Sequence, residues 1–164
     1  MAGPLDSASV QRVRNALKDV GSAAAVIELA HSARTAQDAA NALGTELGSI
    51  VKSLVFVIGD TPVMALIAGD RQCNADALPG VLGLEGEVRR ADAAVVRAAT
   101  GFAIGGVAPV GHPEPLPLAI DASLGRFAVV YAAAGHPHCV FPTSLEELAR
   151  MTPGIVAMEI AREG

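Results

Sequence analysis

The chain has 164 residues, of which 51% are hydrophobic, 18% charged and 3% aromatic, with a formal net charge of −5. This length is typical of one domain, and the composition predicts an aliphatic core. No apolar run reaches the roughly 18 residues that span a membrane, and the first residues do not resemble a signal peptide. The acidic balance argues against a protein that grips a long nucleic acid, although local contact with one nucleic-acid end is compatible with it.

Helical spacing of apolar residues, helix-start signals and apolar runs divide the chain into short elements. The predicted helices are residues 8–20, 35–43, 74–78, 92–97 and 144–151. The predicted strands are residues 24–29, 51–58, 63–68, 87–90, 118–120, 127–132, 139–141 and 155–160. Strands 51–58 and 63–68 should form a hairpin closed by a four-residue turn. We therefore predict an α+β fold, a single domain over 1–164, with a mixed, strongly curved and barrel-like sheet flanked by helices and the helix at 8–20 as an appendage.

One lysine, Lys52, interrupts an otherwise apolar run at 50–58. A lysine is rarely buried unless it is paired or functional, because its ammonium group is costly to desolvate. Lysines of this kind recur in catalytic and anion-binding sites. The alternative is that Lys52 lies where the strand begins and extends its ammonium group into water.

A segment rich in glycine and proline runs from Gly101 to Pro117 and contains the stretch Gly105-Gly106-Val107-Ala108-Pro109-Val110-Gly111. Long ordered loops in compact domains tend to be functional. Glycines let the backbone approach a ligand and direct N–H groups at a carbonyl or an anion. The alternative is a tight connector that binds nothing.

Three side chains that could ligate zinc lie close together in the sequence, namely His136, His138 and Cys139. Their spacing does not readily give tetrahedral geometry, so we expect no metal site. A nucleophilic pair of Cys139 with a histidine is also weakly supported, because adjacent residues of a strand point to opposite faces. Together with Cys73, this cysteine favours free thiols in a reducing cytoplasm over a disulfide. Asp121 is a candidate by position alone, since it ends a strand before a turn.

Five short motifs in this order resemble the YbaK/EbsC family, which comprises the editing domain of bacterial prolyl-tRNA synthetases and its free-standing relatives. The motifs are Thr35-Ala36-Gln37-Asp38-Ala39-Ala40, Ile50-Val51-Lys52-Ser53-Leu54-Val55-Phe56, the G-x-x-x-P loop from Gly105 to Pro109, Gly135-His136-Pro137, and Ser144-Leu145-Glu146-Glu147-Leu148. The resemblance covers roughly residues 22 to 160.

The resemblance implies trans-editing, in which the ester of a mischarged tRNA is hydrolysed, most often on tRNA for proline carrying Ala, Cys, Ser or Thr. It implies that Lys52 is the residue most tied to activity, with His136, or else His138, shaping the pocket. It implies no cofactor, and its partners would be the tRNA acceptor end and a synthetase, in the cytoplasm. The expected substrate-binding residues are Thr35, Gly105, Gly106, Pro109, Val110, Gly111, Asp121, Gly135 and His136.

The chemistry fits these residues, because backbone N–H groups of a glycine-rich loop stabilise charge on an ester carbonyl and a lysine anchors phosphate or ribose. Further phosphate contacts are expected from Lys18, Arg89 or Arg97. Two other interpretations stay open. One is a non-catalytic module that binds an aminoacyl-tRNA end, a nucleotide or a small metabolite, and the other is a hydrolase that uses Cys139.

Overall fold

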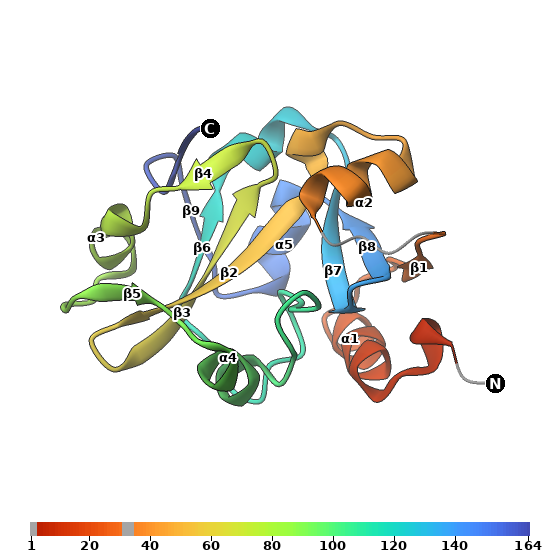
Figure 1. Cartoon of the computed structure of the whole chain (residues 1–164), viewed down its shortest axis with the longest axis horizontal. Helices are drawn as coiled ribbons and strands as arrows, with labels where there is room; N and C mark the ends of the chain where they lie inside the picture. The colour runs from red at the N-terminus through yellow and green to blue at the C-terminus, as the bar shows by residue number, and fades with distance from the viewer. Residues whose placement is uncertain (1–2, 31–34) are drawn as a thin grey trace.

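The computed structural model describes residues 3–30 and 35–164, and Figure 1 shows the arrangement of its helices and strands. The helices are α1 Ala8–Asp19, α2 Ala36–Leu43, α3 Leu78–Leu82, α4 Ala93–Thr100 and α5 Leu145–Met151. Short 3-10 helices are η1 Pro4–Asp6, η2 Leu47–Ser49, η3 Ala75–Ala77 and η4 Ala122–Arg126. The strands are β1 Ile27–Glu28, β2 Val51–Ile58, β3 Thr61–Ala68, β4 Arg71–Cys73, β5 Val88–Arg90, β6 Leu118–Asp121, β7 Val130–His136, β8 Cys139–Thr143, β9 Ile155–Ala157 and β10 Ala161–Glu163. No helix in the described ranges is long and apolar enough to cross a membrane.

The main sheet has five strands in the order β5-β2-β3-β6-β9. β2 pairs antiparallel with both β3 and β5, whereas β6 pairs parallel with β3 and with β9. Separate antiparallel sheets are formed by β1-β8-β7 and by β10-β4. The predicted single α+β domain with a mixed sheet is therefore confirmed.

The prediction of a barrel-like sheet is wrong. Among the described residues the strands form three open sheets, and none of these sheets closes on itself. The main sheet approaches the β1-β8-β7 sheet through one parallel bridge, between Ile50 and Tyr131. Closure would require the two edge strands of the main sheet, β5 and β9, to pair with each other, but in the described residues β5 pairs only with β2 and β9 only with β6.

The β2–β3 hairpin was predicted to have a four-residue turn, but the turn in the structure has two residues. Ile58 lies opposite Thr61, which leaves only Gly59 and Asp60 between the strands. Gly59 has a φ of +62°, a conformation that glycine adopts without steric cost and that two-residue hairpin turns favour. Pro62 is tolerated within β3, opposite Val57, so the strand begins earlier than the apolar run indicated.

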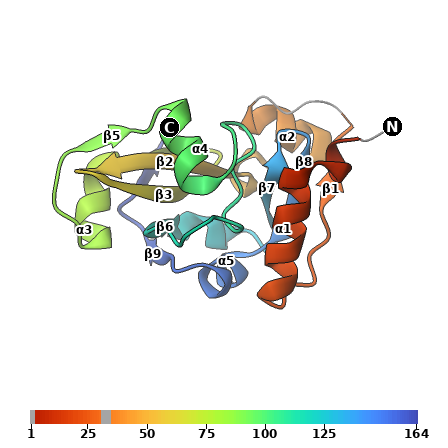
Figure 2. The ribbon, with the colours of Figure 1, turned by 90° about the horizontal axis from the view of Figure 1, so that it is seen from below.

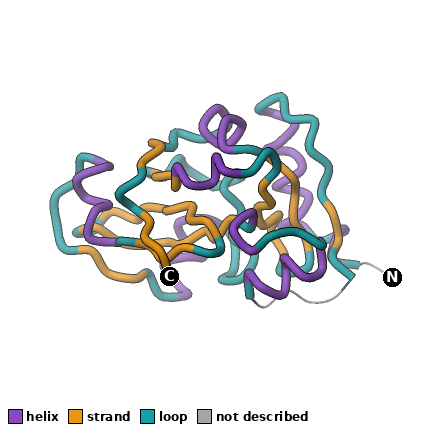
Figure 3. The backbone as a smooth tube through the Cα atoms, turned by 90° about the horizontal axis from the view of Figure 1, so that it is seen from above, coloured by secondary structure: helices purple, strands orange, loops and turns teal. Residues whose placement is uncertain are grey.

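Two large hydrophobic clusters lie on the two faces of the main sheet. One contains Val51 and Val55 of β2 and is covered by α1, α4 and α5. The other contains Phe56 and Ile58 of β2 and is covered by α3. Figure 2 shows α1 beside β7 and α3 at the opposite end of the molecule, and Figure 3 shows the helices and strands from the other side. Since adjacent residues of β2 enter different clusters, this strand is buried on both faces over its C-terminal half.

Helix α1 contributes directly to the main core. Val10, Val13 and Leu17 are almost completely buried, and they lie on one face at helical spacing. Ser7 begins the helix by accepting a hydrogen bond from the N–H of Val10. The helix approaches β7 so closely that a Cβ on Gly135 would lie 2.7 Å from the carbonyl oxygen of Ser9.

Candidate active site

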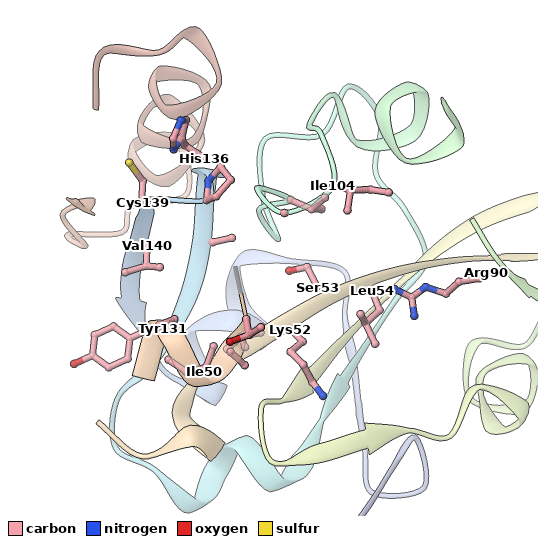
Figure 4. A pocket seen from close by; sticks show the side chains of 18 residues that line it. Ile50, Lys52, Ser53, Leu54, Arg90, Ile104, Tyr131, His136, Cys139 and Val140 are labelled. Carbon is pink, nitrogen blue, oxygen red and sulfur yellow. The ribbon is translucent and has the colours of Figure 1, made fainter. Parts of the chain in front are cut away.

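A cleft of about 390 Å³ opens between the N-terminal half of β2, helix α2, the glycine-rich loop and the β7–β8 hairpin. Figure 4 shows its side chains, with Lys52 and Ser53 on β2 and His136 across the cleft. Much of its wall is aliphatic, including Ala39, Ile50 and Val140, which also form one buried cluster. The cleft therefore combines an apolar wall with a few polar groups, as small-molecule sites commonly do.

The cleft exists because the outer edge of β2 loses its partner strand. β5 pairs with β2 only from Phe56 to Ile58, and one further hydrogen bond joins Ala91 to the carbonyl oxygen of Val55. The next pairing along that edge is the bridge from Ile50 to Tyr131. Between these two points the edge of β2 faces the cleft, which both Lys52 and Ser53 line. The hairpin pattern in the sequence predicts β2, but a free edge depends on where β5 ends.

Lys52 is half-buried, and its ammonium group donates a hydrogen bond to the carbonyl oxygen of Arg71 at 2.5 Å. Figure 4 shows the nitrogen directed toward β4 and away from His136. Burial lowers the pKa of Lys52, while the charges of Cys73, Asp70 and Asp121 act in the opposite direction. The alternative of a lysine fully extended into water is therefore not the arrangement that this structure shows.

Thr35 lies at the start of α2, where its hydroxyl oxygen accepts a hydrogen bond from the N–H of Asp38 at 3.1 Å. The T-x-x-D motif therefore begins the helix as the sequence predicts. Thr35, Ala36 and Ala39 line the cleft. The motif places the helix N-terminus, with its partly unpaired N–H groups, at the edge of the cleft.

The glycine-rich loop contributes Gly105 and Val107 to the cleft, and Ile104 at its rim is 63% exposed. The N–H of Gly106 donates to the carbonyl oxygen of Ala103 and is thereby occupied within the loop. A Cβ on Gly106 would lie 3.0 Å from the carbonyl carbon of Gly135 and from the nitrogen of His136. Gly106 therefore allows the loop to pack tightly on β7, next to a cleft residue.

His136 lines the cleft, and its Nδ1 accepts a hydrogen bond from the N–H of His138 at 3.0 Å. In the neutral imidazole the proton is then on Nε2, which leaves that nitrogen as a hydrogen-bond donor. The ring of His138 packs edge-on against His136, with centroids 5.2 Å apart. His136 thus takes the position that the sequence left open between the two histidines.

Six of the predicted site residues do not line the cleft: Gly106 and Gly135 adjoin it, and the other four lie elsewhere. Pro109, Val110 and Gly111 line a second cavity of about 630 Å³ beside α1. Asp121 is 1% exposed, and its carboxylate accepts hydrogen bonds from the N–H groups of Ala68 and Ser123. Gly135 is next to the cleft histidine, and its φ of +93° is a conformation that favours glycine.

Sequence reasoning did not select Ser53, Arg90, Ile104 or Tyr131, all of which line the cleft. Ser53 follows Lys52 directly, so an unusual polar pair in an apolar strand was the available signal. Arg90 is exposed, and its guanidinium lies 5.4 Å from the centre of the Phe56 ring. Arg89, from which the sequence led us to expect a phosphate contact, instead donates to the carbonyl oxygen of Gly59 and lines a different cavity.

Cys139 also lines the cleft, but it is fully buried within β8. Burial raises the pKa of the Cys139 thiol, so the thiol form predominates at neutral pH and a thiolate nucleophile is disfavoured. Within residues 3–30 and 35–164, no group of three or more His, Cys, Asp or Glu side chains is placed to hold a metal ion.

A family model described as the aminoacyl-tRNA editing domain matches residues 30–151. The chain belongs to this family. The resemblance to the YbaK/EbsC family is thereby confirmed, and the cleft lies within the matched region of this editing domain.

Relatives of the editing domain occur within long proteins and as short chains. Proline–tRNA ligases of Thermoanaerobacter sp. (strain X514) and Lactobacillus helveticus (strain DPC 4571) are 35% and 40% identical over 89 and 130 residues. These matches cover 54% and 79% of this chain but only 16% and 23% of the ligases. The uncharacterized protein YwhH of Bacillus subtilis (strain 168) is 28% identical over 139 residues, covering 84% of this chain and 87% of YwhH.

One similar crystal structure is named as that of a candidate trans-editing enzyme for prolyl-tRNA synthetase. It is 42% identical to this chain, with a TM-score of 0.87, and the alignment covers 96% of this chain and 99% of the other. A second structure, of the hypothetical protein APE2540, is 28% identical with a TM-score of 0.83. The editing-domain fold therefore extends over almost the whole chain.

Proposed function

We propose that this chain is a trans-editing deacylase that hydrolyses the ester of a mischarged tRNA, foremost tRNA for proline carrying a small amino acid. The observation that carries the proposal is Lys52, a half-buried cation on the free edge of β2 in a small cleft of an editing-domain chain. The whole chain from 1 to 164 would act as one editing unit.

The reaction needs a water molecule, a polarised ester carbonyl and a leaving ribose oxygen. The water oxygen bonds to the carbonyl carbon, the bond to the ribose oxygen breaks, and the ribose leaves as an alcohol. One water proton goes to that ribose oxygen, and the second is lost from the resulting acid to solvent. Negative charge develops on the carbonyl oxygen, so hydrogen-bond donors aimed at that oxygen accelerate the reaction.

In this proposal Lys52 anchors the phosphate or ribose of the terminal nucleotide by its charge. Its ammonium group binds a carbonyl rather than a carboxylate in the structure, so its charge is not neutralised by direct pairing. A charge-assisted hydrogen bond in a half-buried site is stronger than one in water. His136 Nε2 and the start of α2 supply further donors to the ribose and to the aminoacyl group.

The aliphatic wall of the cleft supports selection by size. Ala39, Ile50 and Val140 are buried or nearly so, and they leave a volume of about 390 Å³ for the aminoacyl end. A small pocket excludes larger side chains, while it discriminates poorly between groups that differ by one methylene. Alanine, cysteine, serine and threonine are therefore the amino acids that we propose are released as free acids, and the enzyme would act on charged tRNA in the cytoplasm, beside a synthetase.

The test is deacylation of tRNA for proline charged in turn with alanine, cysteine, serine, threonine or proline. We expect the wild type to release one or two of the small amino acids. Lys52→Ala should lower the rate about 100-fold or more, because it removes the charge that positions the terminal nucleotide.

Lys18→Ala is the matched control, because Lys18 is the only other lysine of the chain and lies exposed on α1. It lines a different cavity, so the phosphate contact that the sequence suggested for it is not part of this proposal. The control variant should retain the wild-type rate. Wild-type hydrolysis by Lys52→Ala would remove this residue from the proposal. Tight binding of charged tRNA by the wild type, with no release of any amino acid, would support a binding module instead.

A further inference from the structure

Ser53 carries a buried hydroxyl group for which the described residues supply no hydrogen-bond partner. It is the only side-chain oxygen or nitrogen of this kind in the described part of the chain. Leaving a buried polar group without a partner costs about 1–3 kcal/mol. Ser53 lines the cleft, and Figure 4 shows its oxygen on the side of β2 that faces the cleft, near Ile104. Because Ser53 also lines the cleft, a group bound there is the partner that we consider for this hydroxyl.

The backbone of Ser53 faces the same cleft. In an antiparallel ladder the N–H and C=O groups of alternate residues point to the same side of the strand. The carbonyl oxygen of Val55 accepts a hydrogen bond from the N–H of Ala91, on the side of β2 where β5 lies. Ser53, two residues earlier, directs its N–H and C=O to that side, beyond the last paired residue of β5. One residue thus presents two donors, its N–H and its hydroxyl, along an unpaired edge.

The glycine-rich loop offers fewer donors than its composition indicates. The N–H of Gly106 is bonded to Ala103, and Gly111 lines the other cavity. Gly105 and Val107 of the loop still line the cleft, so the free edge of β2 is a second source of donors for a developing oxyanion beside the G-x-x-x-P stretch.

Ser53 is not placed to act as a nucleophile. A serine hydroxyl attacks an ester only when a general base lies within hydrogen-bond distance to take its proton. No described side chain bonds to the Ser53 hydroxyl, and His136 directs Nδ1 to a backbone N–H. The hydroxyl therefore has the role of a donor to a bound group.

We propose that the Ser53 hydroxyl and the Ser53 N–H together receive the carbonyl oxygen of the aminoacyl ester and stabilise its negative charge during hydrolysis. This inference rests on the proposed deacylase function and adds a catalytic residue to it. The side chain of Lys52 lies on the opposite face of β2 from that of Ser53, so the two residues contact different parts of the substrate. Lys52 anchors the nucleotide, and Ser53 polarises the bond that breaks.

The first experiment compares deacylation by the wild type, Ser53→Ala and Ser53→Thr. Removing one donor of an oxyanion site typically lowers kcat by about 100- to 1000-fold, so the kcat of Ser53→Ala should fall in this range, with KM raised no more than several-fold. Ser53→Thr keeps the hydroxyl and suits a strand, so it should recover most of the lost rate. A wild-type kcat for Ser53→Ala would overturn the proposal.

Ser49→Ala is a matched control, since it also removes a buried serine hydroxyl. Ser49 is 1% exposed, and its hydroxyl is bonded to the Glu46 carbonyl oxygen and to the Thr45 hydroxyl. Its removal should lower the melting temperature and leave kcat unchanged. Ser53→Ala should lower kcat without lowering the melting temperature, because it removes a hydroxyl group that has no hydrogen-bond partner. Equal losses of melting temperature in both variants would assign Ser53 a structural role and overturn the proposal.

A binding measurement separates this inference from the proposed function. The probe is alanyl-adenosine with an amide in place of the ester, and adenosine alone is the reference. Ser53→Ala should weaken binding of the amide probe several-fold and leave binding of adenosine unchanged.

If the wild type binds the probe without hydrolysing any charged tRNA, the deacylase function fails. Weaker probe binding by Ser53→Ala then supports the Ser53 contact with the carbonyl. Equal binding by the two proteins overturns it, as does a wild type that neither hydrolyses nor binds.

Discussion

The charge of Asp70 acts on Lys52, but the two charged groups have different bonding partners. The Lys52 ammonium group binds a backbone carbonyl, whereas Asp70 forms a two-pronged ion pair with Arg126, at 2.7 and 2.9 Å. This pair joins the turn between β3 and β4 to the end of η4. Because Asp70 is already paired with Arg126, the ammonium group of Lys52 stays available for a substrate.

The ion pair gives a pH-dependent prediction. The hydrogen bond from Arg126 lowers the pKa of Asp70 from its ordinary value of 3.8. A carboxyl group with a lowered pKa in the folded state stabilises the fold above its unfolded pKa and loses that effect as the pH falls. Asp70→Asn should therefore be less stable than the wild type at pH 7, by about 0.5–1 kcal/mol because the pair is about one-third exposed.

Urea unfolding of both proteins across a pH series measures this difference. The two stabilities should converge as the pH falls below 3.8, because Asp70 then becomes protonated in the folded protein as well. A difference that is constant across the series would assign the effect to packing rather than to charge.

At the scale of elements, the cleft depends on the contact between the glycine-rich loop and β7. Gly106→Ala places a methyl group 3.0 Å from the backbone of Gly135 and His136, so the loop and the strand must separate by a few tenths of an ångström. Small displacements of positioning groups are costly in catalysis, and we expect about a tenfold lower deacylation rate.

Gly80→Ala is the control for Gly106→Ala. A Cβ on Gly80 in α3 meets nothing within 4 Å, and alanine favours a helix more than glycine does. It should keep the full rate and unfold at the same or a higher temperature. Full activity of Gly106→Ala would show that the loop packing does not position His136.

Much of the element order could be predicted from the sequence because the signals are local. Capping residues begin α1, α2, α4 and α5 at Ser7, Thr35, Asp92 and Ser144, each accepting a bond from a backbone N–H two or three positions into the helix. The β2–β3 hairpin follows from two apolar runs. Such patterns act within a few residues, so they hold whatever the rest of the chain does.

Some of the short strands could not be predicted in this way, although β5 and β9 lie within predicted strands. The predicted strand at 24–29 is reduced to β1, and β4 and β10, with three residues each, were not predicted. The predicted strand at 127–132 runs instead from Val130 to His136, which moves the turn to Pro137 and His138. Three residues cannot display an alternating pattern, so these strands form because partners from distant parts of the chain pair with them.

The site could be predicted only in part, because only some of its residues are marked by the local sequence. Lys52 is unusual for its own strand, so local sequence drew attention to it. Ser53 and Arg90 become cleft residues only because β5 ends at Arg90 and leaves part of β2 unpaired. The loop residues Pro109 to Gly111 face α1, a contact that composition does not specify.

At the scale of the whole molecule, the net charge of −5 limits nucleic-acid contact to a few positions. Arg90 lies in the cleft, and within the described residues it has no ion pair and no side-chain hydrogen bond. Its neighbour Arg89 is bonded to Gly59 and directed elsewhere. Because these adjacent arginines carry the same charge and point in different directions, Arg89 serves as the control for Arg90.

Arg90→Ala should raise the KM for charged tRNA several-fold and reduce the salt dependence of binding by about one phosphate contact. Arg89→Ala should change neither quantity. With aminoacyl-adenosine, which lacks the 5′ phosphate, both variants should match the wild type. Equal changes in KM and in salt dependence for the two variants would indicate a general electrostatic attraction of tRNA rather than a phosphate contact at the cleft.

The walls of the cleft come from separate parts of the chain, from Thr35 in α2 to Val140 in β8. The β2–β3 hairpin is a local pairing, whereas β3 pairs with β6 only after a long crossover through α3 and α4. Because distant pairings form more slowly than local ones, the hairpin can fold while the chain is still being synthesised. The cleft is then complete only when β7 and β8 have emerged from the ribosome, so under the proposed function a nascent or truncated chain would not hydrolyse the charged tRNAs that surround it.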